Sequence, residues 1–349
     1  MISKLEIQNF RLFTDFQIDG LARVNLFVGL NNSGKSTLLE AIYLLANSGT
    51  PDTLAHLWGR RREMVSLRLN ESTPEGGFSE LQRLFHRSNG DSVERAEIKS
   101  TDSSGAKRYI SIHSQYEDDH SDGVKVISSE NEDYVIDMYG MVRKTPGEGA
   151  NGRGQAQRSQ SQNAYWLTTR HLEYSEILRL WNTIKENSEK RQYVHRFLHC
   201  IEPDLLAVGF TSSVFSDPVI TFTLETNGSV TIPIGNMGGG MRAILGVALS
   251  LLASESGILL VDEIDSGLHH TALVKMWEQL LEAAQRFNIQ VFATAHSWDC
   301  VKAFSMALQK TSDKAGALFR LEPIEDQIRV VDYTPEMIAI AVQRVIEVR

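Results

Sequence analysis

The sequence has few cysteines and no long apolar run, and both absences exclude classes of protein. Only Cys200 and Cys300 occur among 349 residues, and their separation does not fit the close spacing of a metal-binding or redox pair. Both are predicted to be small buried apolar residues. No apolar stretch approaches the roughly 20 residues that span a bilayer, and the residues after Met1 lack the apolar stretch of a signal peptide. We expect a cytoplasmic protein without a membrane partner.

An excess of positive charge is also missing. The chain has 35 Lys and Arg residues and 44 Asp and Glu residues, for a net charge of −9. This balance opposes a surface that binds nucleic acid throughout, although a local basic patch stays compatible with it. Hydrophobic residues make up 42% of the chain, an ordinary globular value that excludes extensive disorder. The length favours one large α/β domain that carries an insertion.

The alternation of strands and helices predicts the α/β core. The expected strand 24–28 runs directly into a glycine-containing loop, and helix-like spacing of apolar residues begins at Lys35. A regular alternation returns late in the chain, with expected helices at 241–252, 270–286 and 298–308 and expected strands at 258–261 and 290–293. Such alternation indicates a mostly parallel sheet flanked by helices.

The middle of the chain is less regular and predicts additional parts. The expected parts are the core domain at 1–50 and 204–349, an inserted α+β lobe at 51–143, a flexible linker at 144–164 and a helical arm or hairpin at 165–203. The linker is rich in Gly, Gln, Ser and Asn, so it buries too little apolar surface to offset its ordering entropy. Asn227 and Gly228 separate two strand-like runs and predict a tight antiparallel hairpin.

The loop from Gly29 to Ser36 fits the phosphate-binding pattern G-x-x-x-x-G-K-[ST]. It follows an expected strand and opens an expected helix, so its amides and the helix N-terminus can both face a polyphosphate. Lys35 is predicted to contact the β- and γ-phosphates of ATP, and the Ser36 hydroxyl to ligate Mg²⁺. The other predicted ATP contacts are Asn31, Asn32, Ser33, Gly34 and Thr37. The alternative is an ordinary glycine turn before a helix.

Two carboxylates and a histidine follow the late strands and predict hydrolysis of that nucleotide. Asp262 and Glu263 end the apolar strand 258–261, at the strand end where open α/β sheets bind ligands. Asp262 is predicted to hold Mg²⁺, and Glu263 to polarise the attacking water as general base. His296 follows the next strand and could sense the γ-phosphate. The alternatives are a solvated turn for the acids and an ordinary histidine.

Together these residues resemble the ATP-binding-cassette (ABC) ATPases, specifically the soluble branch that contains RecF, the SMC-like repair ATPases and the OLD (overcoming lysogenisation defect) family. Lys4–Arg11 looks like the opening strand of that branch, Leu259–His269 like its acidic strand and following loop, and Ala295–Ser297 like its switch histidine. The resemblance implies a P-loop NTPase fold of ABC type, with a mostly parallel sheet and an antiparallel strand subdomain. It also implies Mg²⁺-dependent hydrolysis of ATP to ADP and phosphate.

The same resemblance implies further site residues. Arg11 would lie near the adenine, with an ordinary exposed arginine as the alternative, and Asp265 and Ser266 would lie at a dimer seam. The counterpart of the signature loop, which reads Ser-Gly-Gly-Gln in the family, comprises Asn236, Gly238, Gly239 and Gly240. This chain lacks that serine and glutamine, and Asn236 either replaces the serine or has no such role. The family's glutamine loop has no identifiable counterpart within the insertion.

Dimerisation and a separate effector follow from the resemblance as expectations. Two subunits would sandwich two ATP molecules head to tail, each site using the glycine loop of the other chain. OLD-family proteins join this ATPase to a Toprim nuclease, but no Asp-x-Asp pair follows His296, so a nuclease would be a separate polypeptide. The leading hypothesis is therefore an ATPase subunit that regulates such an effector in bacterial anti-phage defence. The helix expected from Pro335 could pack on a partner or complete the core.

Two other functional classes stay open. One is a DNA-repair ATPase of RecF or SMC type that binds duplex DNA. Its phosphate contacts could come from a group of arginines in the insertion, with a solvated face as the alternative: Arg60, Arg61, Arg62, Arg68, Arg83 and Arg87. The other class is the motor subunit of a membrane transporter, from which the glycine loop and the long insertion of this chain depart.

Overall fold

The computed structural model describes the chain in two compact units. The described residues are 1–61, 84–86, 95–115, 123–130, 133–137, 142–144, 164–168, 174–213, 216–226, 228–311 and 315–344. Unit 1 comprises 1–21, 31–164 and 321–331, and unit 2 comprises 22–30, 165–320 and 332–349. The border between the units passes through the glycine loop, after Leu30. The predicted linker 144–164 lies outside the described residues except at its two ends.

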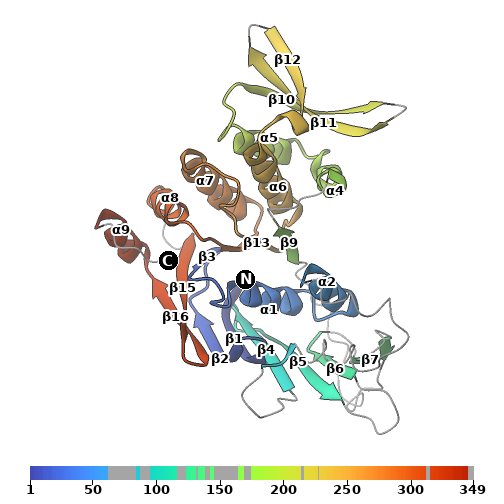
Figure 1. Cartoon of the computed structure of the whole chain (residues 1–349), viewed down its shortest axis with the longest axis vertical. Helices are drawn as coiled ribbons and strands as arrows, with labels where there is room; N and C mark the ends of the chain where they lie inside the picture. Colours follow the sequence, from blue (N-terminus) through green and yellow to red (C-terminus); the bar gives the residue numbers. More distant parts are fainter. Residues whose placement is uncertain are drawn as a thin grey trace. The chain divides into compact units, whose positions relative to one another are not determined.

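Unit 1 is built on an antiparallel sheet of seven strands in the order β2-β1-β4-β5-β6-β7-β8 (Figure 1). The strands are β1 (Ile2–Phe10), β2 (Phe13–Asp19), β4 (Arg95–Asp102), β5 (Lys107–Gln115), β6 (Gly123–Ser128), β7 (Tyr134–Asp137) and β8 (Val142–Lys144). Alternate residues of β1 and β4 are buried, among them Leu5, Ile7 and Ile98. This period of two is typical of a sheet with one face on a core.

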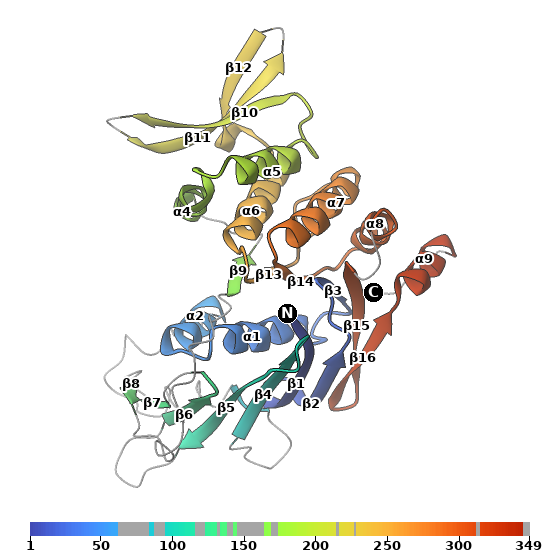
Figure 2. The same cartoon turned by 180° about the vertical axis from the view of Figure 1, so that it is seen from behind.

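Two helices cover the buried face of that sheet (Figure 2). They are α1 (Lys35–Ala46) and α2 (Pro51–Arg61). The turn between them packs closely, because a Cβ atom at Gly49 would lie 3.0 Å from Ile110 of β5. Strands β4 to β7 and most of β8 come from the segment 51–143, and β4 pairs directly with β1. They therefore continue the sheet of the N-terminal hairpin, and the lobe boundaries stay a prediction.

A six-stranded sheet has the order β16-β15-β3-β14-β13-β9, and β3, β13 and β14 supply buried residues to the core of unit 2. Its strands are β3 (Val24–Val28), β9 (Ala164–Thr168), β13 (Ile258–Asp262), β14 (Gln290–Thr294), β15 (Gly316–Ile324) and β16 (Gln327–Tyr333). The pairs β13/β14, β14/β3 and β15/β3 are parallel. Every residue of β3 and β14 is buried, as expected for parallel strands covered on both faces.

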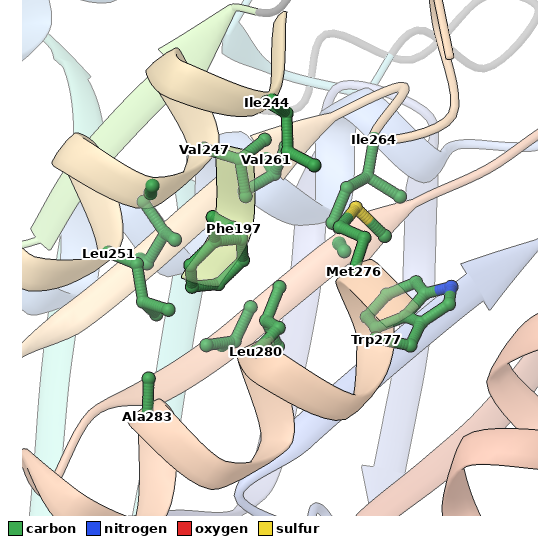
Figure 3. Close-up of a cluster of buried hydrophobic side chains, with 14 of the residues drawn as sticks. Phe197, Ile244, Val247, Leu251, Val261, Ile264, Met276, Trp277, Leu280 and Ala283 are labelled. Atoms are coloured by element: carbon green, nitrogen blue, oxygen red, sulfur yellow. The ribbon is translucent and has the colours of Figure 1, made fainter. Parts of the chain in front are cut away.

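Helices of unit 2 pack around one hydrophobic cluster. They are α4 (Tyr174–Ile184), α5 (Ser188–Leu198), α6 (Gly239–Ala253), α7 (His270–Arg286), α8 (Trp298–Leu308) and α9 (Pro335–Gln343). Figure 3 shows Phe197 of α5 among Val247 and Leu251 of α6 and Leu280 of α7. These four side chains are fully buried, and each contributes roughly 1.5–3 kcal/mol by leaving water. The segment predicted as a helical arm thus packs on the core.

The tail helix α9 also joins this core. Ile338 is fully buried and Ala341 nearly so, and the helix contacts α8. Of the two interpretations of this helix, completion of the core agrees with the buried residues, while Met337 and Ile340 stay exposed. None of the helices in the described part of the chain is long and apolar enough to cross a membrane.

A separate antiparallel sheet precedes α6 in unit 2. Its order is β10-β11-β12, with β10 (Leu205–Ser213), β11 (Ser216–Thr226) and β12 (Gly228–Pro233). Thr226 pairs with Gly228 across the turn, where the tight hairpin is predicted, and Asn227 lies outside the described residues. A short 3₁₀ turn, η4 (Ile234–Asn236), then leads into α6. The predicted combination of a parallel core and an antiparallel strand subdomain is confirmed.

Candidate active site

Three segments that carry predicted site residues follow strands that end at the same edge of the unit 2 sheet. The strands β3, β14 and β13 are neighbours and run parallel, so their carboxyl ends share one edge. Gly29 follows β3, Glu263 follows β13, and His296 follows β14 after one residue. The amide of Ala295 donates to the carbonyl of Phe27 at 3.1 Å and extends the pairing to this edge. Strand order therefore brings together segments that are distant in sequence.

The glycine loop adopts backbone torsions that its sequence allows. Gly29, Asn32 and Gly34 have φ values of 143°, 61° and 90°, in the left-handed half of φ space, which glycine enters freely and asparagine more readily than most residues. A Cβ atom at Gly34 would lie 3.2 Å from two ring carbons of Phe13. The torsion of Gly34 favours glycine, and a side chain at this position would also press on the Phe13 ring.

The start of α1 presents its first-turn amides without a competing side chain. No side chain caps this end of the helix, and its first turn contains no acidic residue. Positive partial charge at a helix N-terminus favours an anion. The Lys35 amine is buried, 3.5 Å from the Ser33 hydroxyl, whereas the Ser36 side chain is exposed and Thr37 is buried. This end of α1 fits a polyphosphate, with Asn31 and Asn32 exposed beside it.

The carboxylate of Asp262 and the backbone amide of Glu263 are both bound by a residue that sequence reasoning missed. The Thr294 hydroxyl, at the end of β14, donates to Oδ1 of Asp262 at 2.7 Å. The hydroxyl oxygen of Thr294 also accepts the amide hydrogen of Glu263 at 2.8 Å. Glu263 has φ 56°, an unusual value for a residue with a side chain. The only sequence signal for Thr294 was its place at the end of a strand that precedes the candidate histidine.

Glu263 and His296 lie close together beyond the carboxyl ends of β13 and β14. Oε1 of Glu263 lies 3.5 Å from Nε2 of His296. The Glu263 side chain is 24% exposed and the His296 side chain 39% exposed, so both are accessible to water and to a ligand. A general base needs contact with the proton that it removes, and this carboxylate has the access that the role requires.

Asp265 fixes the loop that carries the histidine. Its Oδ2 accepts hydrogen bonds from the amides of His296 at 3.3 Å and Ser297 at 2.8 Å. Ser297 in turn caps α8, because its side chain accepts from the amide of Cys300 at 3.1 Å. The amide of Ser266 closes the same turn on the carbonyl of Glu263 at 2.9 Å. The positions of Asp265 and Ser266 at a dimer seam stay predictions.

The predicted signature loop packs against this turn within unit 2. A Cβ atom at Gly240 would lie 3.0 Å from the carbonyl oxygen of Gly267. Gly238 and Gly239 have open space around them, and no side chain caps the N-terminus of α6. Asn236 is exposed at the end of η4. The loop thus offers the approachable backbone that a phosphate contact needs, and its action in trans stays a prediction.

Arg11 differs from the exposed arginine that was the alternative to an adenine contact. It is buried, and its Nε lies 2.8 Å from Oε2 of the buried Glu40 on α1. Its amide donates to the carbonyl of Leu84 at 3.0 Å, and its φ is 51°. The exposed-arginine interpretation is therefore wrong, and the contact with adenine stays a prediction.

The chemistry of the candidate metal ligands fits Mg²⁺ bound together with a nucleotide. Within the described ranges, no group of three or more His, Cys, Asp or Glu residues is placed to hold a metal ion. Mg²⁺ usually binds one or two protein oxygens and takes its other ligands from phosphates and water. A hydroxyl and a carboxylate, as on Ser36 and Asp262, are oxygen ligands of this kind, and their joint binding of one Mg²⁺ ion stays a prediction.

The arginines proposed for DNA contact are only partly described. Arg60 and Arg61 end α2. The other members of the group, Arg62, Arg68, Arg83 and Arg87, lie outside the described residues.

Comparison of the sequence with known families identifies an ATPase domain. The model of the family described as "AAA domain, putative AbiEii toxin, Type IV TA system" matches residues 24–299. An ATP/GTP phosphatase of Helicobacter pylori is 19% identical over 337 residues, which are 89% of each chain. The DNA replication and repair protein RecF of Heliobacterium modesticaldum is 41% identical over 64 residues, 18% of this chain and only 16% of that protein. The predicted enzyme class, an ATPase, is confirmed.

Solved structures show the same fold. The SMC head domain from Thermotoga maritima superposes with a TM-score of 0.50 at 14% identity, over 95% of this chain and 98% of that one. An SmcHead structure, bound to the C-winged helix domain of ScpA, has a TM-score of 0.56 at 13% identity, over 96% and 98% of the two chains. The predicted P-loop fold of the RecF and SMC type is confirmed.

Proposed function

Because the chain belongs to the family described as "AAA domain, putative AbiEii toxin, Type IV TA system", we propose that it binds ATP on Gly29–Ser36 and hydrolyses it with Glu263. The observation that carries the proposal is the position of Glu263, 3.5 Å from His296 at the sheet edge from which the glycine loop starts. A phosphate-binding loop, a base and an imidazole at one strand edge suit phosphoryl transfer to water.

Each residue of the proposed site has a defined part in this reaction. The loop amides and the Lys35 ammonium hold the β- and γ-phosphates in place. Glu263 accepts a proton from the attacking water, and His296 contacts the γ-phosphate. Mg²⁺, when bound with the nucleotide, neutralises charge on the phosphate oxygens, and Ser36 and Asp262 are the residues that would hold it.

The test of this proposal is phosphate release from ATP with Mg²⁺. The wild-type protein should release phosphate, and Glu263→Gln should release it about 10²- to 10⁴-fold more slowly, the usual contribution of a general base. Equal rates in the two proteins would contradict the role of Glu263, and no release by the wild type would contradict the proposal as a whole.

The ATP-bound form is proposed to be a head-to-tail dimer of this chain. The supporting features are the exposed Gly238 and Gly239 and the uncapped start of α6. A phosphate of the partner's nucleotide could approach these amides closely. In Glu263→Gln the ATP would persist, so dimers should accumulate with ATP and dissociate with ADP. Sedimentation measured with each nucleotide distinguishes the two states.

The biological role is proposed to be control of a separate effector, a Toprim-type nuclease, in anti-phage defence of the OLD-like kind. The resemblance of Leu259–His269 to that branch supports it, and the family description names a putative toxin of a toxin–antitoxin system. The test is affinity purification of the tagged protein, expressed with its genomic neighbours, as wild type and as Glu263→Gln. Recovery of a metal-dependent nuclease would support this role, and recovery of DNA without a protein partner would contradict it.

A DNA-repair ATPase is the second candidate, and the short matches to RecF proteins favour it. Contacts to DNA phosphates make binding fall steeply with salt, because counterions are released. A DNA-repair ATPase should therefore hydrolyse ATP faster with duplex DNA, and the stimulation should disappear at high salt. A rate that is independent of DNA would contradict this candidate.

A further inference from the structure

Thr294 connects the ends of two neighbouring strands through its hydroxyl and its carbonyl. The hydroxyl lies 2.7 Å from Oδ1 of Asp262 and 2.8 Å from the amide nitrogen of Glu263. The carbonyl accepts the amide hydrogen of Ile264 at 2.9 Å. Thr294 itself is fully buried, and Asp262 and Glu263 are half-buried. One residue therefore binds three consecutive residues of the opposite loop.

The direction of both hydroxyl bonds is determined by chemistry. A backbone amide can only donate, so Oγ1 of Thr294 must accept from Glu263. The hydroxyl has a single hydrogen, and the carboxylate of Asp262 is the acceptor for it. Removal of the hydroxyl would leave the amide of Glu263 without its acceptor and one oxygen of Asp262 without this donor.

These bonds hold Glu263 in a backbone conformation that it would otherwise avoid. Its φ of 56° lies in the left-handed region, which is sterically unfavourable for a residue with a Cβ atom. The bonds from the amides of Glu263 and Ile264 to Thr294 stabilise the turn on both sides of that torsion. The direction of the Glu263 side chain depends on this turn, and so does its 3.5 Å approach to His296.

We propose that Thr294 is a positioning residue of the hydrolysis site, which orients Asp262 for Mg²⁺ and Glu263 for the attacking water. The inference rests on the proposed ATPase function. Thr294 acts through these two residues. Valine has nearly the same shape as threonine but lacks the hydroxyl. A β-branched residue suits the buried end of β14, so packing alone would accept valine, whereas the proposed role requires the hydroxyl.

The experiment compares Thr294→Val with Thr294→Ser in the full-length protein. Thr294→Val should lower kcat about 10- to 100-fold, the usual effect of a lost hydrogen bond to a metal ligand. The Mg²⁺ concentration for half-maximal binding of a fluorescent ATP analogue should rise by a similar factor, while binding without Mg²⁺ should not change. Thr294→Ser keeps the hydroxyl and should retain both kcat and the Mg²⁺ dependence.

Ser305→Ala is the matched control. The Ser305 hydroxyl on α8 is also buried, and it has no hydrogen-bond partner in the described part of the chain. Its removal tests the general effect of deleting a buried hydroxyl and should leave kcat and the Mg²⁺ dependence unchanged. A fall of kcat in Ser305→Ala equal to that in Thr294→Val would overturn the proposal, because loss of any buried hydroxyl would then suffice.

Wild-type kcat and Mg²⁺ dependence in a folded Thr294→Val would also overturn it. If that variant does not fold, Thr294→Cys replaces it, because a thiol is a weak donor of similar size; a kcat reduced below that of Thr294→Ser supports the proposal, and an equal kcat overturns it. Failure of the ATPase proposal is distinguishable, since the wild type itself would then release no phosphate.

Discussion

The carboxylate of Glu263 lies 3.5 Å from the imidazole of His296, although the two residues follow different strands. The backbone amide of each residue is bound by a residue that neighbours the other one in sequence. Thr294, before the histidine, binds the amide of Glu263, and Asp265, after the glutamate, binds the amide of His296. The two strand ends are thus joined in both directions, through the backbone amides of the residues that carry the base and the imidazole.

Lys35 and Glu263 should separate binding from hydrolysis. Lys35→Ala removes the ammonium that holds the phosphates, so equilibrium binding of ATP should weaken strongly. Glu263→Gln removes only the base, so ATP should bind as in the wild type while hydrolysis falls about 10²- to 10⁴-fold. Binding of a fluorescent ATP analogue and phosphate release measure the two effects. An equal loss of binding in both variants would contradict these roles.

Asp265 should matter as a hydrogen-bond acceptor. Asp265→Ala leaves the amides of His296 and Ser297 without the carboxylate that they bind, and the free energy of unfolding should fall by about 1–3 kcal/mol. Hydrolysis should fall as well, because His296 loses its fixed position. Asp265→Asn keeps an acceptor oxygen and is the control. If denaturant unfolding shows the two variants to be equally stable, the amide contacts contribute little.

Gly239 and Gly240 should respond differently to alanine. A Cβ atom at Gly240 would crowd the carbonyl of Gly267, whereas one at Gly239 meets nothing within 4 Å. Gly240→Ala should therefore lower stability by about 1–3 kcal/mol through overpacking. Gly239→Ala should fold normally but, in the Glu263→Gln background, should prevent the ATP-dependent dimer, because its methyl group blocks the approach of phosphate. A dimer that forms undisturbed would contradict contact in trans.

The buried pair Arg11–Glu40 should show strong coupling. Their side chains are 6% and 5% exposed, so Arg11→Met removes the cation beside a buried carboxylate and should cost about 3–5 kcal/mol. The double variant Arg11→Met with Glu40→Met should be more stable than either single one. The exposed pair Lys302–Asp299 is the control, and Asp299→Ala should cost less than about 1 kcal/mol. Additive effects of Arg11→Met and Glu40→Met would exclude the coupling.

The two cysteines should react slowly and destabilise the fold only at high pH. Burial raises the pKa of Cys200 from 9.0 to about 11, and burial likewise raises the pKa of Cys300. Thiolates are the reactive form, so iodoacetamide at pH 8 should label the native protein far more slowly than the unfolded one. Because the unfolded state loses its protons first, the Cys200 contribution should lower stability between about pH 9 and 11. The prediction that both cysteines are buried is correct for Cys300 and wrong for Cys200, which is half-buried, so rapid labelling of native Cys300 would contradict its burial.

Local patterns predicted the core elements well because burial and torsion are encoded by neighbouring residues. The expected helices 270–286 and 298–308 agree with α7 and α8. The helix α6 begins at Gly239, two residues before the expected 241. The expected start was too late because glycines usually interrupt helices. The expected strand 290–293 ends just before Thr294, the residue that binds the Asp262 carboxylate and the Glu263 amide.

Pairing between distant segments could not be predicted in the same way. The sequence of 51–143 predicts short strands, but nothing local indicates that β4 pairs with β1. The ion pair of Arg11 could not be predicted either, because its partner Glu40 comes from a helix that begins after the glycine loop. A period of two identifies a strand and its buried face without identifying its neighbour.

The sequence by itself predicted the chemistry of the candidate site: a glycine loop between a strand and a helix, two acids after one apolar strand and a histidine after another. Only the tertiary structure decided that Thr294 and Asp265 hold these residues in place. The physical reason is that a hydrogen bond between two strand ends depends on the order of the strands in the sheet. That order results from packing of the whole unit, which no local pattern of residues contains.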